Sequence, residues 1–494
     1  MITLAVGSSD DEHAAVVVDS GTVLSAVNRR DNTTACVREA MDVAGLQLAE
    51  VDMVLATSAN VFPADRIEVV EPHRGHAEQL RPLTPEGTVV VILDDAESGR
   101  VSVVALRGDA RESVGGVEHG TPALRTAAAV ARKLGLSGTN PITSLESIAI
   151  PGPATPLGGR ADDLGGHLLV SIDDSEVDNV LREAAATCPV PLHTTDSPHI
   201  RAQQTRGSVA TQILETLATL IACAAERAKA ATAAPAVAFA GDAFTSPAFT
   251  VRVRQHLAGM VAPVPGIGGA TLGAALVPHR DVAPFDRLGF GRSFSDDQIK
   301  ATLDNCRLEY IYEPRWSRLF ERTSQLLAGG ALVAWFQGRT EFGNQSLGSR
   351  SILCDPSNRY SRENVNVFLL NRPAHAPLRL SMASHAAGSH PLLFTYGSPN
   401  GFAGSGDKLT SAIDRFGRVL YHVPDAGSMP ELHGLLETHY RRTNVPGLLN
   451  VPMTTNGVLT ATPRDAIRET FGSTADALVI GKFIVAKDYW LLRR

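Results

Sequence analysis

The chain has 494 residues, of which 44% are hydrophobic and 20% are charged, a composition typical of soluble globular proteins. A chain of this length should divide into two or three domains, because one hydrophobic core stops growing at about 250–300 residues. The formal net charge of -7 argues against nucleic acid and anionic membranes as partners, since both require a basic surface.

The cysteines and the N-terminus predict a cytoplasmic protein. The five cysteines lie far apart and form no CxxC pair, which is typical of reduced thiols and not of disulfides or a zinc site. The opening residues, MITLAVGSSDDEH, lack the basic and apolar regions of a signal peptide. No segment has the ~20 uninterrupted apolar residues of a membrane helix, so we expect no membrane contact.

The first part of the chain predicts hairpins and a helix. Apolar runs at 2–7 and 14–19 form a hairpin that continues through a turn at Ser20-Gly21. A helix is predicted over 33–44, where Gly45 ends it. A buried strand then follows within 51–58, and a second hairpin is predicted at 87–94 and 100–106.

A long buried helix is predicted over 208–231, where apolar residues recur at helical spacing, and a strand follows it in AVAFA. The two hairpin-bearing halves indicate a duplicated α/β domain of the actin-like or sugar-kinase type. A helix should begin after an N-cap at Ser295, and 331–336 should form a strand. The segment 384–410 is rich in Gly, Ser and His, which predicts a long surface loop with solvent-exposed histidines.

The segment from Trp335 to Pro356 reads WFQGRTEFGNQSLGSRSILCDP. It resembles the block GR-x-EFGPRALG-x-RSI-x-x-DP of the O-carbamoyltransferases of antibiotic and nodulation-factor biosynthesis. The resemblance continues in AIDRFGRVLYHV and LLNVPMTTNG and is weaker before residue 331. Within the block the chain keeps Gly338, Arg339, Glu341, Phe342, Gly343, Leu347, Gly348, Arg350, Ser351, Ile352, Asp355 and Pro356.

The resemblance implies a duplicated actin-like (ASKHA) domain over 1–290 and a YrdC-like α/β domain over 291–494. In such proteins the C-terminal domain makes carbamoyl-AMP from carbamoyl phosphate and ATP. The N-terminal domain then transfers the carbamoyl group to a substrate hydroxyl with the help of a divalent metal. This chemistry requires cationic side chains for the phosphates and hydrogen-bond donors or a cation for the acyl oxygen.

Carried over residue by residue, the resemblance implies three sets of site residues. Asp10 and His13 would be catalytic, and His76 and Asp94 would bind metal. The substrate or the nucleotide would be bound by Arg339, Glu341, Arg350, Arg372, Arg418 and Asn450.

Each of these assignments has a structural alternative. The arginines could be surface charges or members of an ion-pair network, and Glu341 could instead orient Arg350. Asn450 could satisfy buried backbone groups. His13 could be a turn residue, and His76 with Asp94 could form a hydrogen-bonded pair without metal.

Several family positions hold other residues here. Gln345 replaces an arginine, and a lysine, a glutamate and a second arginine fall on Leu370, Pro373 and Ala376. Each lost charged hydrogen bond should cost about 1.5–3 kcal/mol in phosphate binding. Of four expected metal ligands, one falls on Pro72 and another on Ile267 or Gly268.

Two functions follow from this comparison. The first is a carbamoyltransferase-like enzyme that moves a carbamoyl or related acyl group to a hydroxyl or amine of a natural product. The second is a degenerate paralogue without ATP- or metal-dependent chemistry, acting as a partner protein or catalysing a different, metal-free reaction. A homodimer or a pairing with another biosynthetic enzyme is compatible with either function.

Overall fold

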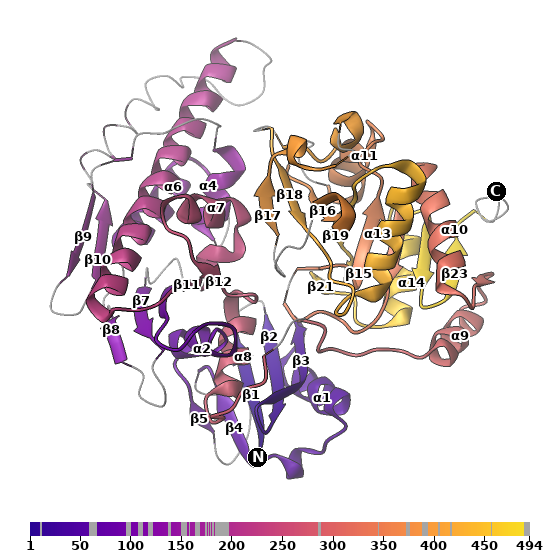
Figure 1. Ribbon diagram of the computed structural model, residues 1–494, viewed down its shortest axis with the longest axis horizontal. Coiled ribbons are helices and arrows are strands. Elements are labelled where there is room, and N and C mark those ends of the chain that lie inside the picture. The colour runs from indigo at the N-terminus through magenta and orange to yellow at the C-terminus, as the bar shows by residue number, and fades with distance from the viewer. Residues whose placement is uncertain are drawn as a thin grey trace. The chain divides into compact units, whose positions relative to one another are not determined.

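A computed structural model of the chain is shown in Figure 1. It describes residues 1–9, 12–58, 67–94, 100–106, 112–116, 122–136, 140–149, 156–157, 159–163, 168–172, 175, 177, 179, 182, 197–284, 288–343, 345–371, 376–387, 394–403, 406–414, 417–455 and 457–488.

The chain divides into two compact units. The first takes in 1–9, 18–22 and 51–284, and the second takes in 10–17, 23–50 and 285–494. The C-terminal unit therefore includes two segments from the first fifty residues. The domain limits inferred from the family resemblance, at 290 and 291, assign these segments to the N-terminal domain and remain a prediction.

The first sheet has the strand order β3-β2-β1-β4-β5. The predicted hairpin is confirmed, and both residues of its turn have positive φ, 48° at Ser20 and 82° at Gly21. The strands are β1 (Ile2–Ser8), β2 (His13–Asp19), β3 (Thr22–Arg29), β4 (Met53–Ala56) and β5 (Glu68–Val69). Helix α1 (Thr33–Ala44) matches its predicted limits, since Asn32 caps its start and Gly45 ends it with φ 71°.

The second sheet repeats this topology. Its strand order is β8-β7-β6-β11-β12, with β11 parallel to both β6 and β12, just as β4 is parallel to both β1 and β5. The strands are β6 (Val89–Asp94), β7 (Arg100–Ala105), β8 (Glu112–Gly116), β11 (Val237–Ala240) and β12 (Met260–Val261). Two sheets with the same order and strand directions confirm the duplicated actin-like α/β fold.

The remaining elements of the first unit are mostly helices. They are α2 (Pro72–Glu78), α3 (Pro122–Lys133), α4 (Pro141–Ile148), α6 (Ser197–Thr232), α7 (Pro247–His256) and α8 (Gly266–Leu276), with a small hairpin of β9 (Gly159–Asp163) and β10 (Leu168–Ile172). Helix α6 begins 11 residues before its predicted start. Its segment Gly207–Thr232 is long and apolar enough to cross a membrane, but 67% of its most apolar window is buried, as in a soluble core helix.

The C-terminal unit is built on a nine-stranded mixed sheet with the order β13-β23-β22-β14-β15-β19-β16-β18-β17. The strands are β13 (Ile311–Tyr312), β14 (Val333–Phe336), β15 (Arg350–Cys354), β16 (Arg379–Met382), β17 (Thr395–Gly397), β18 (Val419–His422), β19 (Gly447–Pro452), β22 (Ala477–Ile480) and β23 (Phe483–Ala486). The short hairpin of β20 (Thr454–Thr455) and β21 (Val458–Leu459) follows β19.

Two apolar cores cover the two faces of this sheet. One contains Leu353, Leu448 and residues of α10 (Trp316–Ala328) and α13 (Pro430–Thr443). The other contains Ile352, Leu449 and residues of α9 (Asp296–Asn305) and α14 (Pro463–Gly472). The predicted cap at Ser295 is confirmed, because its side chain and that of Gln298 form a reciprocal capping box.

The prediction of one surface loop over 384–410 is wrong. The described part of this segment contains the short helix α12 (Ser384–Ala387), strand β17 and two single 3-10 turns. Phe394 and Phe402 are buried, and β17 pairs with β18 at the edge of the sheet. A three-residue strand is too short to produce an alternating pattern, so glycine and serine content dominated the prediction.

Candidate functional site

The family block forms the hairpin from β14 to β15 and the loop between these strands. Strand β14 lies antiparallel to β15, and Phe336 faces Arg350 across the pair. Gly348 in the loop has φ 129°, and a Cβ there would lie 2.0 Å from Cδ2 of Leu432 in α13. The loop therefore packs closely against the start of α13 and requires glycine at this position.

Arg350 has a structural role in this loop. Its side chain is fully buried, and its guanidinium donates to the carbonyls of Thr460 (3.1 Å), Gln337 (2.6 Å) and Gly338 (3.1 Å) and to two further carbonyls. The guanidinium also lies 3.7 Å from the ring centroid of Phe336. All of its donors are thus directed at the protein, an arrangement that favours the structural alternative over phosphate binding.

Glu341 also stabilises the loop. It is 6% exposed, and its Oε1 accepts hydrogen bonds from the backbone of Leu347 (3.1 Å) and Ser349 (2.6 Å). Its Oε2 is buried and has no partner among the residues that the structure describes. Burial raises the pKa of this carboxyl, and the charge of Arg350 opposes the rise. The expected electrostatic link between Glu341 and Arg350 is therefore present without a direct hydrogen bond.

Arg339 ties the loop to other parts of the same unit. Its guanidinium donates to the carbonyls of Phe290 (2.7 Å), Gly291 (2.8 Å) and Leu24 (3.0 Å). The backbone N–H of Gly343 donates to the side chain of Asn28 at 3.2 Å. These bonds hold the segment 23–50 against the block.

A cavity of about 230 Å³ lies between the block loop and the start of α13. The lining includes Gln337, Arg339 and Glu341 from the block and Ser428 from the turn before the helix. The first turn of α13 has no side-chain cap. Unpaired N–H groups at a helix start attract acceptors and negative charge, so the cavity can hold a small polar group.

Asn450 belongs to a row of buried polar side chains across four neighbouring strands. Its Nδ2 donates to the hydroxyl of Ser381, and its Oδ1 accepts from the hydroxyl of Ser351, both at 2.8 Å. The hydroxyl of Ser351 is also hydrogen-bonded to that of Ser346 at 2.6 Å, and the hydroxyl of Ser381 is hydrogen-bonded to Nε2 of His422 at 2.7 Å. Asn450 therefore bridges side chains and does not satisfy buried backbone, which was its predicted structural alternative.

The row ends at a cluster of cationic and aromatic residues near the sheet edge. Arg379 lies 5.2 Å from the ring centroid of Phe394 and has no hydrogen bond or ion pair with any residue in the described ranges. Burial lowers its pKa. Arg418 pairs with Asp414 at 3.2 Å and lies 4.2 Å from the ring centroid of Tyr396. Arg379 and Arg418 are the cationic members of this cluster.

His422 is neutral in this environment. Burial, together with the charge of Arg379, lowers its pKa to about 3. Its Nδ1 is buried without a partner among the described residues, while its ring lies 4.5 Å from that of Phe394. It acts as an uncharged hydrogen-bonding group at physiological pH.

The predicted N-terminal site residues are described only in part. His13 begins β2, where its Nδ1 lies 3.1 Å from the hydroxyl of Thr33, and His76 is buried in α2 with its Nδ1 3.3 Å from Nε2 of Gln79. Asp10 and Arg372 lie outside the described residues, as does the side chain of Asp94. The predicted roles of these residues remain predictions.

The described residues around His76 form no metal site, and the side chain of the other predicted ligand, Asp94, lies outside them. No group of three or more His, Cys, Asp or Glu side chains in the described ranges could hold a metal ion. Two expected ligand positions are occupied by Pro72, the first residue of α2, and by Gly268 or Ile267 in α8. Helices α2 and α8 are in close contact here, because a Cβ on Gly75 would lie 2.1 Å from the carbonyl oxygen of Ala270.

The position of the family's lysine is occupied by Leu370 in this chain. Leu370 follows a π-helical turn (Asn364–Leu369) and packs against the apolar core of the C-terminal unit. A lysine at this position would lose the apolar contact. The family resemblance predicts Asn450 and Arg418 as site residues, but sequence reasoning did not single out their neighbours Ser381, Arg379 and His422. The signals available were the alternating Arg379 and Ser381 of β16 and a histidine at the end of the mostly apolar β18.

The fold and this site define a two-unit α/β protein whose C-terminal unit carries a carbamoyltransferase block. Residues 324–393 match the family model described as carbamoyltransferase C-terminus. This segment is thus similar to the C-terminal part of carbamoyltransferases.

Three curated relatives illustrate the relationship. The chain is 26% identical over 242 residues to nodulation protein NolO of Bradyrhizobium diazoefficiens, covering 46% of this chain and 44% of that protein. It is 25% identical over 242 residues to NolNO of Sinorhizobium fredii, covering 46% and 36%. It is 27% identical over 212 residues to the 3'-hydroxymethylcephem-O-carbamoyltransferase of Amycolatopsis lactamdurans, covering 40% and 38%. Each match thus spans less than half of the relative.

Two solved structures match the chain at low similarity. Full-length HypF in a phosphate- and nucleotide-bound form has a TM-score of 0.43 and 11% identity, covering 56% of this chain and 55% of HypF. The activator of the 2-hydroxyisocaproyl-CoA dehydratase from Clostridium difficile has a TM-score of 0.34 and 13% identity, covering 56% of this chain and 93% of the activator.

Proposed function

We propose that this chain is a carbamoyltransferase-like protein of natural-product biosynthesis, which transfers a carbamoyl or related acyl group to a hydroxyl or amine of a small molecule. The observation that carries this proposal is the family block, which lies beside the Asn450 row and lines a cavity of about 230 Å³. A site built on strands is well suited to holding a small substrate in a fixed geometry.

The cationic cluster would supply positive charge and hydrogen-bond donors to a phosphate-bearing carbamoyl donor. Arg379 and Arg418 would contact phosphate oxygens, because both guanidinium groups lie beside aromatic rings near the edge of the sheet and the Arg379 side chain has no hydrogen bond to the described residues. Arginine suits this role through its fixed fork of donors. The neutral His422 and the amide of Asn450 provide hydrogen-bonding groups that would orient an uncharged acyl group.

ATP and carbamoyl phosphate are the donors that the resemblance implies, and we include both in the proposal. A YrdC-like identity for 291–494 and a cytoplasmic location are further parts of it that rest on the resemblance and composition. We derive no step from a divalent metal, because two of the four expected ligand positions hold Pro72 and either Gly268 or Ile267.

A second function is favoured by a specific observation. The expected metal positions hold Pro72 and Gly268 or Ile267, and the expected lysine is a core-packed Leu370. These changes fit a degenerate paralogue that acts as a partner protein, in a homodimer or with another biosynthetic enzyme, or that catalyses a metal-free reaction.

Product analysis separates the two functions. Purified protein would be incubated with ATP and isotopically labelled carbamoyl phosphate, and carbamoyl-AMP and pyrophosphate would be measured by mass spectrometry and an enzyme-coupled assay. We expect both products from the wild type. Arg418→Ala should lower their rate about tenfold to a hundredfold, since a charged hydrogen bond contributes about 1.5–3 kcal/mol.

Arg318→Ala serves as the matched control, because Arg318 is exposed on α10 outside the block. Its activity should equal that of the wild type. Absence of both products from a folded wild-type protein would exclude ATP-dependent carbamoyl transfer and leave the partner-protein function.

A further inference from the structure

A second cavity, of about 590 Å³, lies in the C-terminal unit and shares no lining residue with the block cavity. Its walls come from the end of β3 and helix α1 on one side and from the β20–β21 hairpin and helix α14 on the other. We call it the α1–α14 cleft. It is lined by Asn28, Arg29, Arg30, Asp31, Ala35, Arg38, Glu39, Asp42, Arg292, Thr455, Val458, Leu459, Ala461, Thr462, Asp465 and Arg468.

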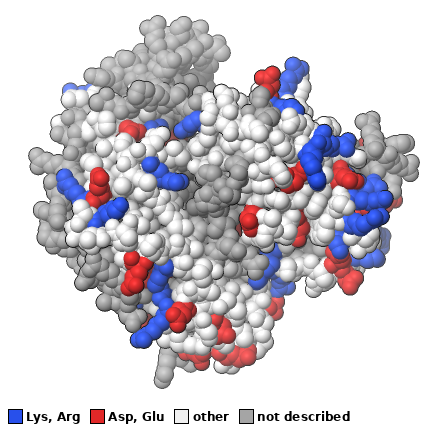
Figure 2. Space-filling model, viewed as in Figure 1, with Lys and Arg blue, Asp and Glu red and all other residues white. Residues whose placement is uncertain are grey.

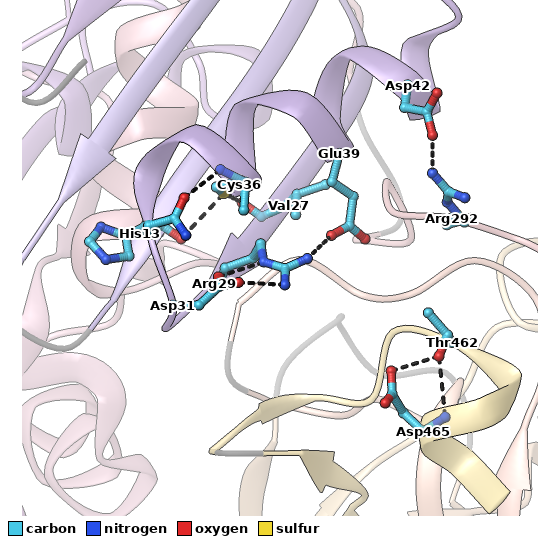
Figure 3. A network of polar contacts seen from close by, with 12 residues as sticks. His13, Val27, Arg29, Asp31, Cys36, Glu39, Asp42, Arg292, Thr462 and Asp465 are labelled. Carbon is cyan, nitrogen blue, oxygen red and sulfur yellow. Dashed lines mark hydrogen bonds and ion pairs between the residues drawn. The ribbon is translucent and has the colours of Figure 1, made fainter. Parts of the chain in front are cut away.

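The carboxylates of the cleft are already paired. Figure 3 shows Arg29 beside Asp31 and Glu39, with contacts of 2.6 Å to each carboxylate. These partners raise the pKa of Arg29. Arg292 pairs with Asp42, likewise within the cleft.

Asp465 is also occupied. Its carboxylate accepts from the hydroxyl of Thr462 at 2.6 Å and lies 3.1 Å from the guanidinium of Arg468. The backbone N–H of Asp465 donates to the hydroxyl of Thr462, so the start of α14 is capped. The four carboxylates that line the cleft therefore have cationic or hydroxyl partners.

Two arginines of the cleft, Arg30 and Arg38, are not paired with its carboxylates. Arg30 and Arg38 are exposed, and neither has a hydrogen bond or ion pair with any residue in the described ranges. The charge of Arg30 acts on Glu12, and its guanidinium lies against the β20–β21 turn, where a Cβ on Gly457 would lie 2.6 Å from its Nη1. Arg38 projects from α1, which is fixed by its caps at Asn32 and Gly45.

We propose that the α1–α14 cleft binds a small molecule through a phosphate monoester or inorganic phosphate, with Arg30 and Arg38 as its cationic contacts. Five arginines and four carboxylates line the cleft. Three of the arginines pair with the four carboxylates, so Arg30 and Arg38 remain as the cations available to a ligand. Ala35, Val458 and Leu459 add an apolar wall for the body of the molecule. The volume lies within the range of about 300–1,000 Å³ of small-molecule sites.

Arginine labelling followed by peptide mass spectrometry tests this site directly. The full chain would be treated with phenylglyoxal alone, with phenyl phosphate and with inorganic phosphate. We expect phosphate compounds to protect Arg30 and Arg38 and to leave the exposed Arg318 labelled as before. Equal labelling of Arg30 and Arg38 with and without both compounds would overturn the proposal.

Calorimetric titration identifies the source of the phosphate group. Tighter binding of phenyl phosphate than of inorganic phosphate supports a monoester ligand, and equal binding supports free phosphate. Arg30→Ala and Arg38→Ala should each weaken binding at least tenfold, since each removes a charge-assisted hydrogen bond. Arg318→Ala should bind as the wild type does. Unchanged binding in both cleft variants would also overturn the proposal, whether or not the chain transfers a carbamoyl group.

Discussion

Arginine residues of the C-terminal unit differ in their hydrogen bonds, which depend on the groups that surround each guanidinium. Arg350 donates only to backbone carbonyls and is buried, although it stands in the block that carries the family resemblance. Arg379 falls outside that block and has no hydrogen bond to the described residues. Membership in the motif therefore does not by itself indicate that an arginine has donors available to a ligand.

The buried His422 should make stability depend on pH. Its pKa is about 3 in the folded protein, because of burial and the charge of Arg379, whereas an unfolded histidine titrates near pH 6.5. The unfolded state binds more protons between these values, so stability falls as pH decreases from about 6.5. From this residue we expect the free energy of unfolding to fall by about 2 kcal/mol between roughly pH 7.5 and pH 5.

Urea unfolding of the wild type and His422→Gln at both pH values measures this effect. Glutamine keeps a group able to hydrogen-bond Ser381 but cannot titrate. The variant should therefore lose about 2 kcal/mol less than the wild type over this range. The same pH dependence in both proteins would show that His422 takes up a proton while the protein is folded.

At the scale of elements, glycine contacts bring two helices of the first unit together. A Cβ on Gly75 of α2 would lie 2.1 Å from the carbonyl oxygen of Ala270, and one on Gly273 of α8 would lie 1.7 Å from the carbonyl oxygen of Gly75. Neither backbone can move aside without separating the helices. The contact therefore requires glycine at these two positions, which lie on the same helices as three of the expected metal-ligand positions.

Gly273→Ala should destabilise the first unit by about 2–3 kcal/mol or more, since the added methyl group collides with backbone. Thermal unfolding followed by circular dichroism measures the change. Gly472→Ala is the matched control, because Gly472 ends α14 and a Cβ there would meet nothing within 4 Å. If both variants unfold at the wild-type temperature, the helices are not in the close contact described.

Elements with local signals could be predicted from the sequence, and those that depend on distant contacts could not. The limits of α1 and the cap at Ser295 were correct because capping residues mark them directly. Strand β17 was missed because its pairing with β18 is set by tertiary contacts. For the same reason, the row from Ser351 to His422 could not be predicted, since the register of four strands aligns it.

At the scale of the whole molecule, two units of different architecture are present in one chain. The repeated strand order identifies the first as a duplicated fold, and the block identifies the relationship of the second. On the face shown in Figure 2, basic and acidic side chains are intermixed among the residues drawn in colour. The expectations of no nucleic-acid partner and of a small-molecule substrate remain predictions, as does the oligomeric state.

The most direct test of the account is isothermal titration of the purified, metal-analysed chain with ATP and then with carbamoyl phosphate. We expect both compounds to bind the wild type, and Arg379→Ala to weaken binding about tenfold or more through loss of a charged contact. Binding of neither compound to the folded wild-type protein would contradict a carbamoyltransferase-like site in the C-terminal unit.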